Sequence, residues 1–182
     1  MTSANYQNAL KFVWRPGFDD PADGFHVTPG DAGGGTFGGV IEATWMNAVL
    51  ERRASGLLRN ATLDDLAAIL RDEFWGPECD ALPVGIDFML FNGRMMSGAY
   101  PRIFQSCLGF IAADVDGEIG PVTMGAAFSA APATFANALT GGHYVYLSGL
   151  HAWPEFKHGW TTRLQAARMT ALGMIRGAAS AV

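Results

Sequence analysis

The sequence predicts a mainly α-helical domain, and three observations lead to this prediction. Apolar residues recur at spacings of three and four along every long periodic segment, which is the period of an amphipathic helix. Of the 182 residues, 49% are hydrophobic and 16% are charged, which is typical of a folded core. No long segment alternates as a strand does, so no sheet larger than a small ribbon is expected.

The expected helices follow one another closely along the chain. The first ends at Pro16-Gly17, and the third begins at Thr62 with Asp65 three residues later, as in a capping box. The third is expected to stop at Gly76-Pro77. The helices are expected over about residues 4–14, 41–49, 62–75, 86–96, 101–108, 134–150 and 161–175.

The connecting segments differ in length and composition. Residues 16–39 are rich in glycine, proline and aspartate, and a loop of this length in a compact domain is usually functional or disordered. Residues 114–121 predict a turn, and residues 153–160 are expected to join the last two helices. The Ala/Gly-rich tail after Arg176 is expected to be frayed.

Composition and charge exclude several classes of function. The net charge of −5 and the lack of a basic stripe make nucleic acid a poor partner. No segment has the roughly 20 apolar residues of a membrane span, and the N-terminus lacks the pattern of a signal peptide. Synthesis in the cytoplasm is therefore expected, with a later export route left open.

Neither a metal nor a cofactor is expected. Cys79 and Cys107 are not in a CxxC pair, so two reduced core thiols are favoured over a disulfide or a metal site. The histidines His143, His151 and His158 lack the compact spacing of zinc ligands.

The stretch from Asp31 to Gly39 is the strongest candidate for a functional loop. Asp31 could hold or activate a water that Thr36 orients, and Gly33 and Gly34 would let the backbone approach a sugar closely. Phe37 is a candidate for stacking on a sugar face, as is Phe18 in the loop before it. The alternatives stay open, because Asp-Ala-Gly-Gly also forms turns and Thr36 could cap a helix that begins near Gly39.

Several motifs occur in the same order as in one known family. They are the glycine loop with Asp31, Gly33, Gly34, Thr36 and Gly39; Phe74-Trp75 before Leu82-Pro83-Val84-Gly85; Ser97-Gly98; Leu108-Gly109 with Asp116-Gly-Glu-Ile-Gly-Pro-Val-Thr123; and Trp153-Pro-Glu-Phe156-Lys-His-Gly-Trp160-Thr-Thr-Arg163. Over roughly the whole chain this pattern resembles glycoside hydrolase family 108, the phage-type N-acetylmuramidases.

The resemblance implies a fold, a substrate and a setting. It implies a lysozyme-like helical fold packed as one compact unit, with a muramidase-like region over residues 1–99 and a peptidoglycan-binding region over residues 100–182. The implied partners are the glycan strands of peptidoglycan and a phage protein, and the implied reaction is cleavage between N-acetylmuramic acid and N-acetylglucosamine. The implied place of action is the periplasm and cell wall, or the virion.

The chain departs from the family at three polar positions. Where the family has the catalytic Glu of Glu-Gly-Gly-Tyr, this chain has Arg15-Pro16-Gly17-Phe18. A glycosidase of the usual kind needs a second carboxyl group beside Asp31. The family's Asp and Asn on the central helix become Asn92 and Met96. Asn92 and Ser97 are expected to contact substrate across the cleft from the Asp31 loop.

The nearest acids that could replace the missing Glu are Asp19, Asp20 and Asp23, although solvated turn carboxylates are the simpler interpretation. Glu42 is an outside candidate and is expected to be exposed. Arg15 could instead pair with Asp31 and lower the pKa of its carboxyl.

Two main functions follow, and a weaker third is kept. The first is an active muramidase, and the second is a degenerate one that binds the wall or a phage partner without hydrolysis. The third is an enzyme for a different glycan, served by the reshaped loop 16–30. Trp75, Trp153 and Trp160 are interpreted as core residues rather than sugar platforms.

Overall fold

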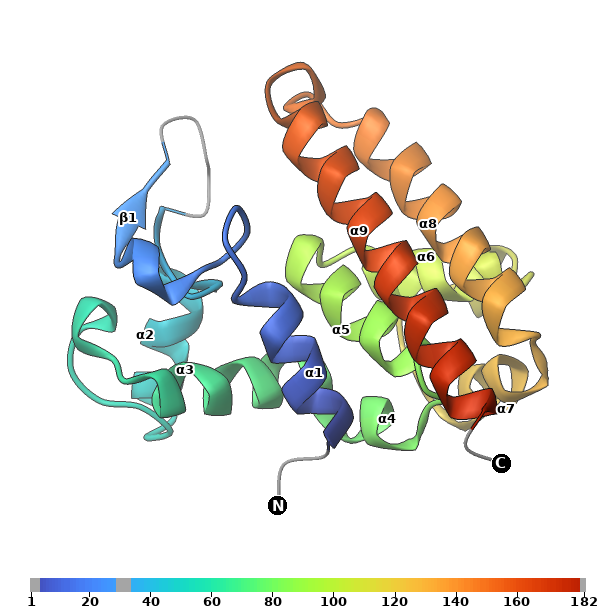
Figure 1. The fold of residues 1–182 in the computed structure, drawn as a ribbon, viewed down its shortest axis with the longest axis horizontal. Coiled ribbons are helices and arrows are strands. Elements are labelled where there is room, and N and C mark those ends of the chain that lie inside the picture. Colours follow the sequence, from blue (N-terminus) through green and yellow to red (C-terminus); the bar gives the residue numbers. More distant parts are fainter. Residues whose placement is uncertain (1–3, 29–33, 181–182) are drawn as a thin grey trace. The chain divides into compact units, whose positions relative to one another are not determined.

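The fold is mainly helical, as predicted, in a computed structural model that describes residues 4–28 and 34–180 (Figure 1). The contacts divide the chain into two compact units, Met1–Gly76 and Pro77–Val182, rather than the one unit expected from the sequence. The boundary expected near residue 99 separates a muramidase-like region from a peptidoglycan-binding region. The contacts within the fold do not test that division of function. The helix over residues 86–96 therefore belongs to the C-terminal unit.

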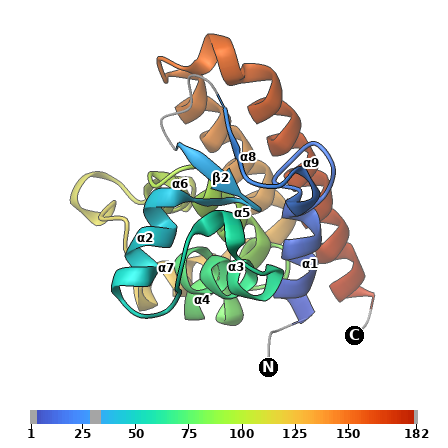
Figure 2. The ribbon, with the colours of Figure 1, turned by 90° about the vertical axis from the view of Figure 1, so that its left-hand side faces the viewer.

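The N-terminal unit combines helices with three very short strands. Its elements are α1 (Ala4–Val13), η1 (Pro21–Asp23), β1 (His26–Val27), β2 (Gly35–Phe37), β3 (Val40–Ile41), α2 (Glu42–Leu50), η2 (Leu58–Asn60), α3 (Leu63–Leu70) and η3 (Arg71–Trp75). The strands form one antiparallel sheet in the order β1-β2-β3, and Figure 2 shows β2 beside α2. This is the small ribbon that the sequence allowed.

A tight turn of two glycines sets the register of this sheet. Phe37 pairs with Val40, so Gly38 and Gly39 are the two residues of the hairpin loop, and both have positive φ, 54° and 84°. Two successive positive φ angles are typical of the hairpin turns whose twist matches that of the strands. Trp14 at the end of α1 donates its indole N–H to the Gly38 carbonyl at 2.9 Å, which fixes the turn against the first helix.

The third helix begins as the sequence predicted. The Thr62 hydroxyl accepts from the Asp65 amide, and the Asp65 carboxylate accepts from the Thr62 amide, which completes a capping box. The Thr62 hydroxyl also donates to the Asp65 carboxylate at 2.7 Å, and this contact, together with the Thr62 amide, lowers the pKa of the Asp65 carboxyl. After Leu70 the chain widens into one π-helical turn, η3, which no sequence pattern predicted.

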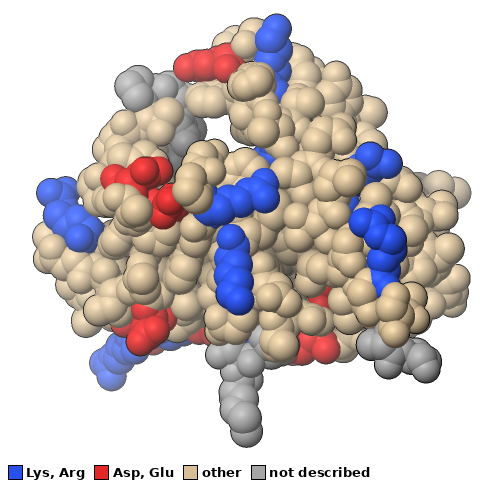
Figure 3. Space-filling model, viewed as in Figure 1, with Lys and Arg blue, Asp and Glu red and all other residues tan. Residues whose placement is uncertain are grey.

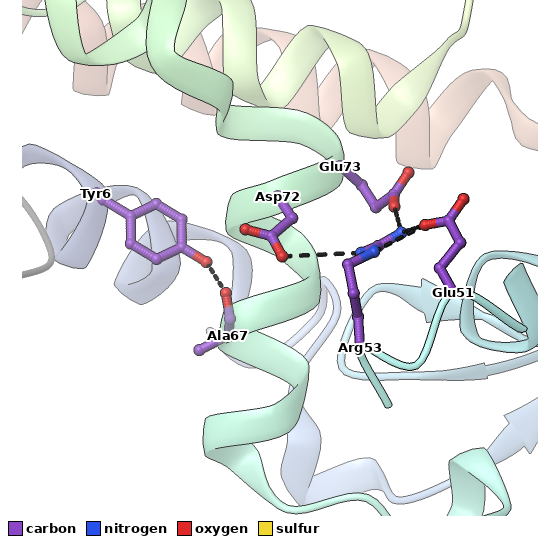
Figure 4. Close-up of polar contacts among 6 residues, drawn as sticks. All are labelled: Tyr6, Glu51, Arg53, Ala67, Asp72 and Glu73. Atoms are coloured by element: carbon purple, nitrogen blue, oxygen red, sulfur yellow. Dashed lines mark hydrogen bonds and ion pairs between the residues drawn. The ribbon is translucent and has the colours of Figure 1, made fainter. Parts of the chain in front are cut away.

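Two side chains hold α3 and η3 against the rest of the N-terminal unit (Figure 4). Tyr6 on α1 donates its hydroxyl to the Ala67 carbonyl, and its burial raises the pKa of that hydroxyl. Arg53, just after α2, forms ion pairs at 2.5 Å with both Glu51 and Glu73. Its hydrogen bonds to Glu51 and Glu73 raise the pKa of the Arg53 guanidinium.

The C-terminal unit is a bundle of helices. Its elements are α4, which begins at the junction (Gly76–Ala81), α5 (Ile86–Met96), α6 (Tyr100–Cys107), η4 (Ala112–Asp114), α7 (Pro121–Ser129), α8 (Pro132–Ser148) and α9 (Trp153–Ala179). Figure 1 shows α8 and α9 running side by side, with α5 and α6 next to them. The helix over residues 86–96 is confirmed to the residue, and it is buried nearly all round.

Gly76-Pro77 ends the third helix, as predicted, because the Gly76 φ of 63° turns the chain after Trp75, and the separate helix α4 begins there. One connector expected from the sequence is wrong. Residues 153–160 are not a connector, since α9 runs unbroken from Trp153 to Ala179. Pro154 lies in the first turn of α9, where a missing backbone N–H costs nothing.

A buried glutamine organises the turn over residues 114–121. The Gln105 side chain accepts from the Gly117 amide at 2.7 Å and donates to the Asp116 carboxylate at 2.6 Å. This contact and the Glu118 amide lower the pKa of the Asp116 carboxyl.

The described residues contain no helix that is both long and apolar enough to cross a membrane. Within residues 4–28 and 34–180, no three His, Cys, Asp or Glu side chains cluster as a metal site would need.

Candidate active site

The glycine loop enters the described structure at Gly34. Asp31 and Gly33 lie outside the described residues, so their predicted roles stay predictions. Gly34 has a φ of 71°, which a side chain would strain. Thr36 is in β2, paired with His26 on one side and Ile41 on the other.

Thr36 does not cap the helix that follows. That helix, α2, begins at Glu42, and its N-cap position is Ile41, which makes no side-chain hydrogen bond to the first turn. The capping alternative for Thr36 is therefore wrong, while its predicted role in orienting a water stays a prediction. Phe37 is half-buried in the same strand.

At Gly35, side chains from other parts of the N-terminal unit pack closely against the glycine loop. A Cβ built there would overlap the Phe25 ring and would lie 2.8 Å from a carboxylate oxygen of Glu42. The Arg59 guanidinium lies over the Phe25 ring, with its central carbon 4.8 Å from the ring centre. Gly35, Phe25, Glu42 and Arg59 thus form one cluster. Glu42 is exposed, as predicted, yet its carboxylate faces the glycine loop.

A cavity of about 250 Å3 lies beside this cluster in the N-terminal unit. It opens between α2 and the segment that leads into η2, and it has one carboxylate and one guanidinium among apolar walls. Its lining residues are Glu42, Trp45, Met46, Leu57, Leu58 and Arg59. Concave sites with a few polar groups on apolar walls are typical of small-ligand binding.

Replacing Gly35 with alanine is expected to destabilise the N-terminal unit by about 2 kcal/mol, because the new methyl group overpacks against Phe25. Urea unfolding, followed by circular dichroism, measures this change. The matched control is the double variant Gly35→Ala with Phe25→Leu, in which the smaller side chain makes room. If the double variant is no more stable than the Gly35→Ala protein, the contact with Phe25 does not limit this position.

Arg15, which the resemblance is expected to put at the family's acid position, is held between two aromatic rings. Its guanidinium carbon lies 4.3 Å from the centre of the Phe12 ring and 4.2 Å from that of Phe18. Such contacts are attractive because the ring faces are electronegative. Phe18, predicted as a sugar-stacking candidate, is thus already packed against Arg15 and against Phe12, with ring centres 5.2 Å apart.

The three acids near Arg15 differ in their surroundings. The Asp20 carboxylate accepts from the Ala22 amide at 2.9 Å and caps the short helix η1. Asp23 is exposed, whereas Asp19 is half-buried, with its amide bonded to the Val13 carbonyl at 3.0 Å.

Asn92 and Ser97 have partners inside the C-terminal unit. The Asn92 side chain is 2% exposed; its oxygen accepts from Arg163 Nε at 3.0 Å, and its amide faces the Met96 sulfur at 3.7 Å. The Ser97 hydroxyl accepts from the Ala99 amide at 3.1 Å at the end of α5. Their predicted contacts with substrate stay predictions.

Next to Asn92 and Arg163 lie two buried polar groups that the sequence did not single out. Tyr100 and His143 are each 1% exposed, and their ring centres are 4.8 Å apart. Within the described part of the chain, neither the Tyr100 hydroxyl nor His143 Nε2 has a hydrogen-bond partner. Burial, helped by the charge of Arg163, lowers the pKa of His143 to about 4.

Two of the three tryptophans assigned to the core lie at the surface. Trp75 is fully buried, as predicted, but Trp153 and Trp160 are only half-buried. The sequence held a usable signal, because residues 153, 156, 157 and 160 share one face of a helix. That signal was missed because residues 153–160 were interpreted as a connector.

Several solved structures resemble this chain, and one of them matches it over nearly its whole length. "Structure of Brucella abortus SagA" matches with a TM-score of 0.80 and 27% sequence identity, over 96% of this chain and 98% of that chain. The mainly helical, lysozyme-like fold class is thereby confirmed. No curated protein matches the chain.

The sequence family described as Glycosyl hydrolase 108 matches residues 23–98. This stretch contains the glycine loop, the cavity residues and α5. This match and the likeness to the Brucella structure support the resemblance to glycosyl hydrolase family 108 that the sequence motifs indicate.

Proposed function

We propose that this protein binds peptidoglycan and hydrolyses its glycan strand between N-acetylmuramic acid and N-acetylglucosamine. The observation that carries the proposal is the family match over residues 23–98, which includes the glycine loop and the Glu42 cavity. In the reaction, one carboxyl group protonates the leaving sugar oxygen while a water, activated by a carboxylate, adds to the anomeric carbon. Asp31 is the proposed water-activating group, oriented through Thr36.

The proton donor must be a carboxyl other than residue 15. Asp19 and Glu42 are the two best placed among the described residues. Asp19 is half-buried in the loop after α1, and a Glu42 carboxylate oxygen lies 2.8 Å from where a Cβ on Gly35 would stand. Asp20 is less suitable, because its carboxylate already caps η1.

A second candidate function is wall binding without hydrolysis. The specific observation in its favour is Arg15, which the resemblance puts at the acid position and which is stacked between Phe12 and Phe18. A guanidinium cannot serve as the general acid, because it holds its proton at neutral pH. In this case the cleft would be retained for recognition alone.

Release of muropeptides from purified peptidoglycan tests both functions. The parent is expected to release them, and Asp31→Ala is expected to lower the rate by roughly a hundredfold or more, as for loss of a positioned acid–base group. Asp19→Asn and Glu42→Gln identify the proton donor, and Asp64→Ala, an exposed acid on α3, is the control that should not change the rate.

The decisive comparison is with a restored acid. Activity that appears only after Arg15→Glu, alone or together with Pro16→Gly and Phe18→Tyr, would establish the non-hydrolytic function for the parent. An active parent that is insensitive to Asp31→Ala would remove Asp31 from the mechanism.

We also propose the setting in which the protein works. It acts in the periplasm at the cell wall or as part of a virion, in a phage or prophage context, with synthesis in the cytoplasm. The C-terminal region, residues 100–182, serves to bind peptidoglycan. Detection of the protein in purified phage particles, by immunoblot after nuclease and density-gradient purification, separates the virion from the cell-wall location.

A further inference from the structure

Arg59 in η2 is stacked on an aromatic ring beside the cavity of the N-terminal unit. The central carbon of its guanidinium lies 4.8 Å from the centre of the Phe25 ring, and that ring packs against the glycine loop at Gly35. The short helix η2 also contacts β2, the strand that contains Thr36. A guanidinium that stacks on a ring uses its flat face, so the N–H groups along its edge stay available for a planar ligand group.

The Arg59 guanidinium has no acidic partner in the part of the chain that the structure describes. None of the ion pairs there involves Arg59, although the exposed Glu42 carboxylate lines the same cavity. Glu42 is likewise absent from these ion pairs. An arginine that is oriented by a ring and not engaged by a carboxylate suits the carboxylate of a ligand, to which it can donate two parallel hydrogen bonds.

An apolar wall completes the cavity. Trp45 is 2% exposed, and its indole N–H donates to the Gly56 carbonyl at 3.0 Å, which ties the segment before η2 to α2. Met46 and Leu57 line the same cavity and are 52% and 61% exposed. A ligand with a small alkyl group would cover this apolar surface, which is now in contact with water.

The size and the charges of the cavity limit what it can bind. Its volume of about 250 Å3 lies below the roughly 300–1,000 Å3 of pockets that enclose drug-sized ligands, so a short substituent fits it better than a row of sugar rings. A bare anion would be repelled by Glu42. A ligand that offers an amide N–H to Glu42 and a carboxylate to Arg59 satisfies both groups, and a short acidic peptide has this combination.

Broad electrostatic attraction does not account for recognition of an anionic group by this protein. The net charge is −5, and both basic and acidic side chains are spread over the face drawn in Figure 3. A surface of mixed charge on an acidic protein does not steer an anionic polymer toward itself. Selection of an anionic substituent therefore requires a local contact, and Arg59 offers one next to the glycine loop.

We propose that the cavity beside Glu42 and Arg59 is a subsite for the acidic peptide substituent of peptidoglycan. The Arg59 guanidinium pairs with a carboxylate of this peptide, and the Glu42 carboxylate accepts from one of its amide N–H groups. An alkyl side chain of the peptide lies on Met46 and Leu57. The protein thereby distinguishes a glycan strand that carries peptides from a bare one.

This inference rests on the proposed function, because it takes peptidoglycan as the substrate. It adds which part of that substrate the N-terminal unit recognises. It also gives Glu42 an ionised, binding role, which leaves Asp19 as the proton donor of the two carboxyl groups considered above.

Binding is measured on the full-length chain carrying Asp31→Ala, so that hydrolysis does not consume the ligand. Three probes are compared by titration calorimetry: a disaccharide-tetrapeptide muropeptide, the same disaccharide after an amidase has removed the peptide, and a neutral N-acetylglucosamine tetramer. The peptide-bearing probe is expected to bind about tenfold more tightly than the other two, as for a hydrogen-bonded charged group. The disaccharide without peptide keeps its lactyl carboxylate, so the comparison separates the peptide from the lactyl group.

Arg59→Gln is expected to remove this preference. It should weaken binding of the peptide-bearing probe about tenfold and leave the other two probes unchanged. Arg59→Lys keeps the charge without the planar fork, so it should recover only part of the preference. Leu57→Ser should weaken the peptide-bearing probe about threefold through the lost apolar contact.

Two matched controls lie in the same unit. Lys11→Gln on α1 removes an exposed positive charge, and Leu63→Ser on α3 removes an apolar side chain that is 51% exposed. Neither should change the binding of any probe. Far-ultraviolet circular dichroism and the melting temperature of each variant verify that the fold is kept.

The inference is overturned if the folded Arg59→Gln protein keeps the preference for the peptide-bearing probe, or if that preference is absent before the change. It is also overturned if Arg59→Gln weakens the disaccharide without peptide equally, which would assign Arg59 to the lactyl carboxylate. Hydrolysis is measured separately on the chain that retains Asp31. An active parent whose preference does not depend on Arg59 refutes the subsite alone, and an inactive parent whose preference does depend on Arg59 refutes hydrolysis alone.

Discussion

Replacing Gly93 with alanine is expected to lower the free energy of unfolding by about 3 kcal/mol, which is more than a hundredfold in the folding equilibrium. Gly93 lies within α5, and the Tyr100 ring packs directly against it, so a Cβ would overlap three ring carbons. Tyr100 has little room to move, since its ring is 1% exposed and is packed against His143. Alanine is the better helix former by about 1 kcal/mol, so the observed loss would be the net of a larger clash.

Gly141→Ala is the matched control for this substitution. Gly141 lies within α8 of the same unit, and a Cβ there would meet nothing within 4 Å. Its replacement should stabilise the protein by up to about 1 kcal/mol. Urea midpoints at fixed pH compare the two variants. If both glycines give the same gain with alanine, Tyr100 yields easily and the packing around it is loose.

Acid is expected to destabilise the C-terminal unit through His143. Burial lowers the pKa of this histidine in the folded protein to about 4, while an unfolded chain titrates near 6.5. Below pH 6.5 the unfolded state therefore binds a proton that the folded state does not, and stability falls as the pH drops. The loss is complete near pH 4 and amounts to about 3 kcal/mol.

The His143→Phe variant isolates this effect from the titration of carboxylates. Phenylalanine keeps the ring contact with Tyr100 and removes the proton-binding site and the unpartnered Nε2. The difference in unfolding free energy between parent and variant should change by about 3 kcal/mol between pH 7 and pH 4. His158→Phe, at an exposed position on α9, should show no such change. If the difference in unfolding free energy between the parent and His143→Phe does not change with pH, His143 binds its proton equally well in the folded and in the unfolded state.

The sequence predicted the helices well where their ends carry local signals. Residues 86–96 lie between Gly85 and Ser97-Gly98, and α3 begins at a Thr62-Asp65 capping box. Local sequence therefore predicted where both helices begin. Pro154 and Gly159 were misleading, because proline is tolerated in a first turn and long-range packing against α8 carries α9 past the glycine. Strands of two or three residues are too short to show alternation, so the sheet around Thr36 could not be located.

The sequence singled out candidate site residues, but it could not predict their surroundings. The glycine loop is recognisable by its glycines and Thr36. The packing of Phe25 onto Gly35, with Glu42 beside it, joins residues that are up to 17 positions apart and depends on the sheet register. The burial of Asn92 on α5 likewise depends on Arg163 from α9, a partner 71 residues away. No local pattern encodes such partners.

The stack of Phe12, Arg15 and Phe18 has a consequence for how easily this chain could change its chemistry. A glutamate at position 15 would put a negative charge against two electronegative ring faces, where the arginine is now stabilised. Exchanging Arg15 for a carboxylate alone would therefore lose two favourable ring contacts, so an acid at this position needs a compensating change in the rings around it.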